Sequence, residues 1–335
     1  MTMHALVKHS HAPHDVSLVN LPRPLPGSGE VIVRTEAVGL CGSDVHAWRG
    51  DAGYEWVPTP VTLGHEAVGI VEEVADGIEE SWVGQRVVPI SIDGCGSCTV
   101  CRTGQRQICP QRTVLGLSFP GAAARFFTIG VDRLIEVDAR LPASALALTE
   151  PWAIAVHAVE RLTSATGEDT LDTVVTGPGP IGVMAALILQ SKGHRVTLVG
   201  TAQDRTVRLA MAEDLGLETS IGDELPDNPA LWLEASGSEK AMSTALQRTA
   251  AGGTVVVPAI YPEIPRVDVN LITRREINVL GSYGAGRADY RSAAAQISAD
   301  PQRWARMVTA FSFGEATKAL EDISRGKVLK AVLLP

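Results

Sequence analysis

The first 150 residues contain several short stretches in which hydrophobic and polar side chains alternate. Residues 31–37 (VIVRTEA) and 68–74 (VGIVEEV) have this pattern, and a period of two is typical of strands that bury one face. Glycine and proline, which favour turns, separate these stretches. This part of the chain is therefore expected to form a β-rich, barrel-like domain.

From about residue 152 the pattern changes to short apolar runs that alternate with stretches of helical periodicity. Helices are expected from Pro180 to a stop at Gly193, over 204–215, and after a cap at Ser238. Strands that alternate with helices predict a parallel, doubly wound sheet of the α/β class. The predicted strands are 173–176, 195–199, 231–235, 254–258 and 277–280.

The last fifty residues no longer follow this alternation. Two further helical stretches after Gly286 and a closing strand at 328–334 are expected there. We therefore expect this segment to return to the first domain. The predicted organisation is a β-rich domain formed by 1–151 and 286–335, and an α/β domain formed by 152–285.

The composition of the chain argues against several classes of partner. Of its 335 residues, 45% are hydrophobic and 20% are charged, which suits two folded domains. A net charge of −9 disfavours a nucleic acid as partner. The longest apolar helical run, 181–189, is too short to span a membrane, and residues 1–4 show no signal-peptide pattern. A cytoplasmic protein is expected, with a small molecule as substrate.

Four of the five cysteines crowd into one short lobe at about residues 94–110. Their spacing is C-x2-C-x2-C-x7-C, and four thiolates in one loop can surround a tetrahedral Zn²⁺ at about 2.3 Å each. A closed four-sulfur shell leaves no position for a substrate, so such a site is structural. Free redox-active thiols and an iron–sulfur cluster are the alternatives for this pattern. The cysteines of the lobe are Cys95, Cys98, Cys101 and Cys109.

A glycine-rich turn follows the first predicted strand of the α/β domain and precedes a helix. Gly177 permits the tight turn, Gly179 lets the backbone approach a pyrophosphate, and Gly182 lets helix and strand pack closely. Pro180 and Ile181 open the helix, whose N-terminus favours an anion. The turn therefore predicts a dinucleotide site, with a glycine-rich turn of an unrelated α/β protein as the alternative.

The position that distinguishes NAD from NADP lies about twenty residues further on. An acidic residue there holds a ribose 2′-hydroxyl in NAD-binding proteins, but nineteen residues after Gly182 stands the neutral Thr201. Arg205 follows nearby and is able to pair with a 2′-phosphate. Asp204 adjoins it, and both residues also suit the opening of the next helix. The sequence thus favours NADP, with NAD as the alternative.

Residue types that bind metals also stand in three widely separated segments of the first domain. Taken singly, each has a structural explanation: the cysteine as a small core residue, the histidine as a turn residue, and the last glutamate as a surface acid before a helix-opening proline. Their meaning depends on whether the fold brings them together. The segments are 39–46 (GLCGSDVH), 64–66 (GHE) and 149–151 (TEP).

Taken together and in this order, the motifs resemble the zinc-dependent medium-chain dehydrogenase/reductase family, and most closely its polyol (sorbitol) and threonine dehydrogenase branch. The resemblance covers essentially the whole chain. It implies a GroES-like catalytic domain and a Rossmann dinucleotide-binding domain. The motifs that carry it are GLCGSD (39–44), GHEAVG (64–69), the cysteine lobe, EP (150–151), GPGPIG (177–182) and EASG (234–237).

The resemblance implies a role for each residue of the three segments. Cys41 and His65 bind a catalytic zinc directly. Glu66 and Glu150 are its carboxylates, one as a ligand and the other as a ligand or an outer partner acting through water. Asp44 accepts the remaining ring N–H of His65. The cysteine lobe then holds a second, structural zinc.

The resemblance also implies the chemistry. A zinc site with three protein ligands keeps one position open for a substrate oxygen. Ser43, the cofactor ribose and His46 form the proton relay that the family uses, and hydride passes between the substrate carbon and the nicotinamide. The expected substrate is a secondary alcohol or ketone of a sugar, polyol or amino-alcohol metabolite. Simple aliphatic alcohols, aldehydes or ketones are the alternative, and a homodimer or homotetramer is expected.

The chain departs from the branch in three places, and the first two weaken the case for a polyol itself. Ala47 stands where sorbitol dehydrogenases place a tyrosine, and residues 281–283 (GSY) replace a Phe-Arg pair. Arg125 replaces an acid in the segment 121–127 (GAAARFF), and we have no physical account of that exchange. The combined presence of the three metal-binding segments disfavours a non-enzymatic cofactor-binding protein, and the net charge of −9 disfavours a zinc-ribbon protein that binds nucleic acid.

Overall fold

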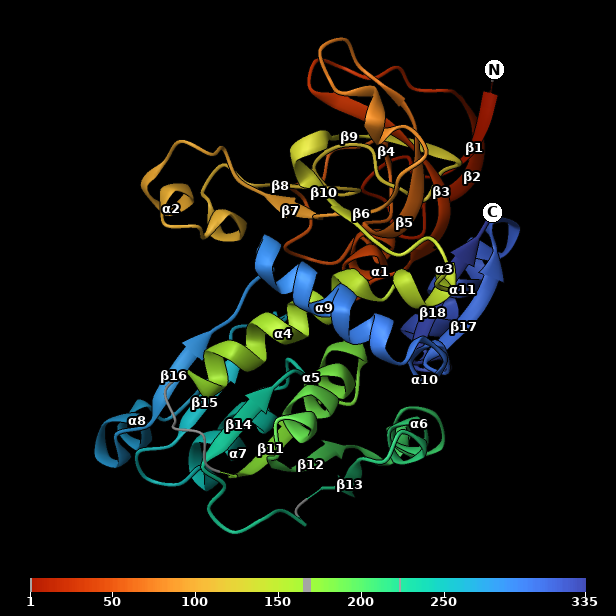
Figure 1. The fold of residues 1–335 in the computed structure, drawn as a ribbon. Coiled ribbons are helices and arrows are strands. Elements are labelled where there is room, and N and C mark those ends of the chain that lie inside the picture. The colour runs from red at the N-terminus through yellow and green to blue at the C-terminus, as the bar shows by residue number, and fades with distance from the viewer. Residues whose placement is uncertain (1, 165–169, 223) are drawn as a thin grey trace. The chain divides into compact units, whose positions relative to one another are not determined.

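The computed structural model describes residues 2–164, 170–222 and 224–335, and the chain forms two compact units (Figure 1). Unit 1 consists of Met1–Ala153 together with Gly286–Pro335, and unit 2 consists of Ile154–Ala285. Within the part of the chain that the structure describes, no helix has the length and apolar character needed to cross a membrane.

Unit 1 is built mainly from antiparallel strands. Its strands are β1 (Thr2–Lys8), β2 (Val16–Pro22), β3 (Glu30–Gly39), β4 (Val61–Thr62), β5 (Glu66–Val74), β6 (Arg86–Pro89), β7 (Ile92–Asp93), β8 (Thr113–Val114), β9 (Phe126–Gly130), β10 (Leu134–Glu136), β17 (Val308–Ser312) and β18 (Lys330–Leu334). The largest sheet has the order β10-β6-β5-β3-β18-β17, with β9 also paired to β3. A three-stranded sheet has the order β2-β1-β4, and β7 pairs with β8.

The last strand of the chain lies next to an early one. Strand β18 pairs antiparallel with β3, with Val332 opposite Gly39, and β3 pairs with β5, with Gly39 opposite Glu66. The two neighbours of β3 therefore bring the start of β5 and the start of β18 to the same place. This juxtaposition builds one side of the site described below.

The helices of unit 1 are short. They are α1 (Gly42–Arg49), α2 (Thr99–Arg102), α3 (Ala143–Leu146), the first residues of α4 (Thr149–Thr163), α9 (Arg287–Ala299), α10 (Pro301–Ala305) and α11 (Ala316–Ser324), with single 3-10 turns at Glu80–Trp82, Arg106–Ile108, Val131–Arg133 and Phe313–Glu315. After Gly286 the sequence predicted two helical stretches, but there are three. The break arises because Asp300 leaves helical geometry and caps α10, accepting the N–H of Arg303 at 3.2 Å before Pro301 starts the new helix.

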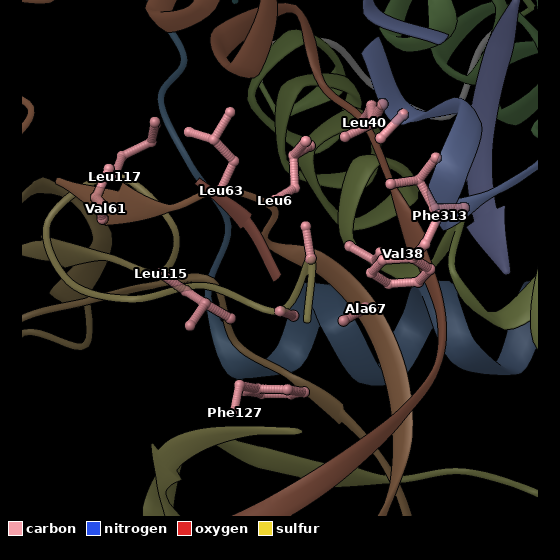
Figure 2. Packing of buried hydrophobic residues seen from close by; sticks show 14 of the residues in the cluster. Leu6, Val38, Leu40, Val61, Leu63, Ala67, Leu115, Leu117, Phe127 and Phe313 are labelled. Atoms are coloured by element: carbon pink, nitrogen blue, oxygen red, sulfur yellow. The ribbon is translucent and has the colours of Figure 1, made fainter. Parts of the chain in front are cut away.

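The main core of unit 1 lies against the central strand β3. Val31 and Val33 are fully buried in this cluster, and Leu63, Leu115 and Phe127 are among the side chains that Figure 2 shows packed there. The intervening Ile32 is fully buried as well, in a second cluster on the opposite face. Strand β3 is therefore covered on both faces, whereas its alternating sequence predicted one exposed face.

Unit 2 contains a parallel sheet of six strands. They are β11 (Asp172–Thr176), β12 (Arg195–Gly200), β13 (Glu218–Ile221), β14 (Leu231–Glu234), β15 (Thr254–Val257) and β16 (Asn278–Gly281). Their order is β13-β12-β11-β14-β15-β16, and every neighbouring pair is parallel. This is the strand order of the doubly wound dinucleotide-binding fold, so the predicted fold class and the five predicted strands are confirmed. Strand β13 was not predicted, because its four residues (ETSI) are polar or partly exposed and lie at the sheet edge.

The helices of unit 2 are α5 (Pro180–Ser191), α6 (Ala210–Asp214), α7 (Glu239–Arg248) and α8 (Val269–Arg275), and α4 continues into this unit. Helix α5 begins and ends as predicted, and the Ser238 hydroxyl caps α7. The prediction of one regular α-helix over 204–215 is wrong. A 3-10 turn (Ala202–Asp204) and a π-helical stretch (Arg205–Leu209) precede α6. The carboxylate of Asp204 accepts the backbone N–H of Thr201, so Asp204 belongs to the capped 3-10 turn and not to the α-helix.

Candidate metal centres and nucleotide pocket

The four cysteines of the lobe converge on one point. Cys95 Sγ lies 3.9 Å from Cys101 Sγ and 3.7 Å from Cys109 Sγ, and Cys98 Sγ lies 3.8 Å from Cys109 Sγ. Sulfurs placed tetrahedrally about 2.3 Å from a zinc ion are separated by about 3.8 Å along each edge. The sulfurs are too far apart for disulfides, whose S–S bond is about 2.05 Å. Their arrangement fits a four-thiolate metal site.

Polar contacts hold the lobe and favour the thiolate form of its first cysteine. The guanidinium of Arg106 donates to both carboxylate oxygens of Asp93 and to the carbonyl of Gly94, just before the first cysteine. Hydrogen bonds from the side chain and backbone of Ser97 lower the pKa of Cys95 to about 6. A depressed thiol pKa favours metal binding, because the thiolate is the ligand.

A second group of metal-binding side chains forms at the meeting point of β3, α1 and β5. The ligand atoms of Cys41, His65 and Glu66 all lie within 4.8 Å of one another. Cys41 is the N-cap of α1, Glu66 is the first residue of β5, and His65 follows Gly64, which has a φ of 89°. His65 and Glu66 are buried, and Cys41 is half-buried. The fold therefore brings together two of the three segments in one compact group.

Asp44 ties the two ligand-bearing loops together. Its carboxylate is fully buried and accepts the backbone N–H of Cys41 at 2.9 Å and that of Gly64 at 3.1 Å. It lies 3.8 Å from Nδ1 of His65, which is longer than a hydrogen bond. The expected hydrogen bond to the histidine ring is thus not formed here. Asp44 instead fixes the backbone on both sides of the group.

The donor set fits a zinc ion. A thiolate, an imidazole nitrogen and a carboxylate are all ligands that Zn²⁺ accepts, and three protein ligands are the number found in catalytic zinc sites. Nδ1 of His65 is buried and has no hydrogen-bond partner among the described residues. Burial lowers the pKa of His65, but the carboxylate of Asp44 and the side chain of Cys41 outweigh it and raise this pKa well above its usual value. The site thus attracts positive charge.

A buried lysine stands beside this group and was not anticipated from the sequence. Lys330, the first residue of β18, forms an ion pair with the carboxylate of Glu66 and donates to the carbonyl of Leu40 at 3.0 Å. Both charged side chains are buried, with relative exposures of 2% and 1%. Burial lowers the pKa of Lys330, but the nearby Glu66 and Cys41 raise it overall. The lysine compensates the carboxylate charge within the protein.

Glu150 lies outside the compact group. It stands in the first turn of α4, is buried, and accepts a hydrogen bond of 2.6 Å from the hydroxyl of Ser91. Burial raises the pKa of Glu150, with the charge of Glu66 adding to the effect and His65 opposing it. Glu150 is therefore close enough to interact with the group electrostatically, while one of its oxygens is engaged by Ser91.

The two residues expected to move protons lie on α1. Ser43 Oγ lies 3.5 Å from Nε2 of His65. His46 Nδ1 and Asp51 Oδ2 are 2.7 Å apart, and the His46 ring stacks on Tyr54 with centroids 5.1 Å apart. Burial raises the pKa of Asp51, but the hydrogen bond with His46 and the charge of Arg49 lower it overall. Asp51, which the sequence did not single out, lies just beyond the end of α1 and orients the His46 ring.

The glycine-rich turn of unit 2 has the backbone geometry that the fingerprint requires. Gly177 has a φ of 93°, and a side chain on it would meet the backbone of Ser236 at 2.6 Å. A side chain on Gly182 would collide with the carbonyl of Gly177. Both positions therefore need glycine, and the turn leads directly into Pro180 and Ile181 at the N-terminus of α5.

A cavity of roughly 450 Å³ opens at the carboxyl ends of the parallel strands of unit 2. Gly177, Gly179 and Thr201 line it, together with Arg208 and Lys240. Arg205 is not among its lining residues and lies against a separate hollow. The sequence favoured Arg205 as the basic residue nearest to Thr201, whereas Arg208, three residues further on, lines the cavity.

Comparison with known proteins agrees with this architecture. Residues 27–139 match the alcohol dehydrogenase GroES-like domain, and residues 143–333 match the glucose dehydrogenase C-terminus. A sorbitol dehydrogenase of Halalkalibacterium halodurans is 31% identical, with 99% of each chain covered. An L-threonine 3-dehydrogenase of Xanthomonas campestris is also 31% identical, again with 99% of each covered.

A solved structure shows the same fold. A protein of Sinorhizobium meliloti described as a zinc-binding dehydrogenase, in a structure bound to NADP, superposes with a TM-score of 0.90 at 25% identity, and 100% of each chain is covered. The sequence relatives, the two domain matches and this structure all point the same way. The chain therefore belongs to the zinc-dependent, medium-chain alcohol dehydrogenase family, in the branch of the sorbitol and threonine dehydrogenases.

Proposed function

We propose that the protein is a zinc-dependent oxidoreductase that transfers a hydride between NAD(P) and a secondary alcohol or ketone of a sugar, polyol or amino-alcohol metabolite. The observation that carries this proposal is the compact group of Cys41, His65 and Glu66, in a chain that also has the dinucleotide turn at Gly177–Gly182. The names of the sorbitol and threonine dehydrogenase relatives support the substrate class.

The proposed roles follow from the contacts of the side chains. A zinc ion held by Cys41, His65 and Glu66 would supply Lewis-acid chemistry toward a substrate oxygen. Ser43 and His46 are the proposed carriers of the substrate proton, and Asp51 keeps the His46 ring in one orientation through its 2.7 Å hydrogen bond. The four cysteines of the lobe are proposed to hold a second, structural zinc, which their sulfur separations of 3.7 to 3.9 Å support.

The test of this function is a panel of substrates with both cofactors. Sorbitol, threonine, glucose and simple aliphatic alcohols are each incubated with NAD and with NADP, and the reduced cofactor is followed by its absorbance. Turnover of a polyhydroxylated or amino-alcohol substrate well above that of the aliphatic alcohols supports the proposal. Preferential turnover of aliphatic alcohols identifies the alternative function, and a zinc-loaded protein with no turnover in either direction contradicts both.

We further propose that Arg208 contacts the 2′-phosphate of NADP. It lines the cavity beside the neutral Thr201, and its buried Nε has no hydrogen-bond partner among the residues that the structure describes. Its guanidinium lies 3.3 Å from Asp204 and is therefore held at the cavity wall. A hydrogen bond to a charged group contributes about 1.5–3 kcal/mol. We expect Arg208→Ala to weaken NADP binding roughly tenfold or more while changing NAD binding little, as measured by fluorescence titration.

Arg205→Ala is the matched control for this prediction, because it removes the same charge three residues earlier from a side chain that lies outside the cavity. It is expected to change neither affinity appreciably. An equal loss of NAD and NADP binding in the Arg208 variant contradicts a role at the 2′ position. A loss in the Arg205 variant alone returns that role to Arg205, the residue that the sequence favoured.

A homo-oligomer is proposed through the edge of the parallel sheet. Strand β16 ends the sheet, and its side chains are largely exposed. Val279 on this strand is exposed, as are Val269 and Ile264 in the segment that precedes it, and an open strand edge with an exposed apolar side chain suits pairing with a second copy. We expect a dimer or tetramer by analytical ultracentrifugation, and dissociation when Val279 is replaced by Asp. A wild-type monomer contradicts the proposal.

A cytoplasmic location is part of the proposed function. All five cysteines are free thiols in the structure. Both proposed metal groups depend on cysteines that remain reduced, which is the normal state of thiols in the cytoplasm.

A further inference from the structure

Three buried side chains from distant parts of unit 1 form one hydrogen-bonded chain beside the Cys41, His65 and Glu66 group. Ser91, between β6 and β7, donates its hydroxyl to Glu150 Oε1 at 2.6 Å. Tyr290, on α9, lies with its hydroxyl 3.0 Å from the Ser91 Oγ and 3.0 Å from the Ser91 backbone nitrogen. Ser91 and Tyr290 are each only 1% exposed. No water is needed to complete this chain.

The direction of each hydrogen bond in the chain is determined by the groups involved. A backbone N–H only donates, so the Ser91 N–H donates to the Tyr290 oxygen. An ionised carboxylate only accepts, so the Ser91 hydroxyl donates to Glu150. The Ser91 oxygen must then accept the hydrogen of the Tyr290 hydroxyl. Each donor of Ser91 and Tyr290 is therefore committed, and reversing any one bond leaves a buried donor unpaired.

The backbone of Ser91 is itself held in place. The buried guanidinium of Arg133 donates to the carbonyl of Ser91 at 2.7 Å and to the carbonyl of Ile90 at 3.0 Å. The backbone N–H of Ser91 donates to the hydroxyl oxygen of Tyr290. Because both peptide groups flanking Ser91 are engaged, its hydroxyl occupies a fixed position. A fixed donor restrains the carboxylate that it contacts.

We propose that Ser91 and Tyr290 are positioning residues that restrain Glu150 and keep one of its oxygens away from the zinc group. The proposal rests on the proposed function, because it concerns the same metal site. The charges of His65, Glu66 and Lys330 act on the Glu150 carboxyl, so a cation bound at the group would attract this carboxylate as well. The hydroxyl of Ser91 occupies Oε1 and makes Glu66, rather than Glu150, the carboxylate that joins Cys41 and His65.

The inference predicts that Ser91→Ala releases Glu150 toward the metal. In protein whose catalytic site is loaded with Co²⁺, we expect weaker visible absorption bands, since an added carboxylate ligand raises the coordination number. Removal of the metal by a chelator becomes slower rather than faster. The kcat falls by about 10- to 100-fold, the usual range for loss of an outer partner of a metal site, while the Kd of the dinucleotide stays unchanged. Tyr290→Phe is expected to cause the same changes, each smaller than in Ser91→Ala.

Three further variants separate positioning from a general structural role. Ser91→Thr keeps the hydroxyl and is expected to restore the wild-type spectrum. Tyr261→Phe removes a comparable bond from a tyrosine to a carboxylate, that of Glu234 in unit 2, and is expected to leave the cobalt spectrum unchanged. In a Glu150→Gln background, Ser91→Ala is expected to add no further spectral change, because both act through the same carboxylate.

The outcomes distinguish this inference from the proposed function. A wild-type protein that holds no Co²⁺ at Cys41 overturns the proposed function, and the positioning role fails with it. A normal wild-type site with an unchanged spectrum in both Ser91→Ala and Tyr290→Phe overturns the positioning role alone. Faster metal loss in Ser91→Ala, or an equal effect in the Glu150→Gln background, also overturns it. Thermal unfolding of each variant shows whether the fold is retained, and Tyr290→Phe provides the test if Ser91→Ala does not fold.

Discussion

Replacing Cys41 by Ala is expected to lower kcat/KM by roughly 10³-fold or more while leaving the fold intact. The side chain supplies one of three donor atoms that lie within 4.8 Å of one another. Lewis-acid stabilisation by a bound metal is worth several kcal/mol, and each 1.36 kcal/mol corresponds to a factor of ten in rate. Cys41 is small and only half-buried, so its truncation leaves little cavity. Steady-state kinetics with the best substrate and metal analysis measure the effect.

A cysteine of the lobe provides the matched control. Cys98→Ala removes one thiolate from the four-sulfur group, whose loop depends on its metal for order. Both variants are expected to lose about one zinc ion per chain from a total of about two. The Cys41 variant loses turnover and keeps its thermal stability, whereas the Cys98 variant loses thermal stability first. If Cys41→Ala remains active with its zinc content unchanged, the proposed catalytic site is wrong.

Replacing Lys330 by Met is expected to destabilise the metal-free protein by about 3–5 kcal/mol, the range found when one member of a buried ion pair is removed. The substitution leaves the carboxylate of Glu66 buried without its cation, and Glu66 is only 1% exposed. It also removes the hydrogen bond to the carbonyl of Leu40. A bound zinc ion supplies positive charge at the same carboxylate, so the loss is smaller in the zinc-loaded protein. Denaturant unfolding with and without zinc measures both.

Two substitutions make this prediction specific. Lys330→Arg keeps the charge and is expected to recover part of the stability. Glu66→Gln combined with Lys330→Met removes both charges, and it is expected to be more stable without metal than Lys330→Met alone. An identical loss in the metal-free and zinc-loaded proteins contradicts the view that lysine and metal compensate the same carboxylate. A loss below about 1 kcal/mol, the size found for exposed ion pairs, contradicts the view that the substitution leaves an uncompensated buried charge.

Local patterns predicted much of the fold and the family. The glycine turn at 177–182 encodes a backbone path that only glycine can follow, and the structure shows that path. The cysteine spacing is equally local, because all four ligands lie within one loop. Short apolar strands alternating with helices determined the doubly wound sheet. In the glycine turn and the cysteine lobe the residues that interact are close in sequence, so their spacing contains the geometry.

The parts of the candidate site that sequence could not supply involve single residues brought together by distant elements. Lys330 reaches Glu66 only because β18 and β5 both flank β3. Tyr290 reaches Ser91 from a helix that follows the whole of unit 2. No spacing rule connects such pairs. Arg208 was missed for another reason: Arg205 is closer to Thr201 in sequence, and only the structure shows which of the two side chains lines the cavity.

The position of β18 also affects how the protein is made. Unit 2 is one continuous segment, Ile154–Ala285, inserted between the two parts of unit 1. On the ribosome it can fold as soon as it emerges, while the earlier segment with Cys41 and His65 still lacks the strand that carries Lys330. The first-made portion of the chain is therefore the last to be completed, and a nascent chain has to protect an unfinished sheet edge next to Gly39 until synthesis has passed Leu334.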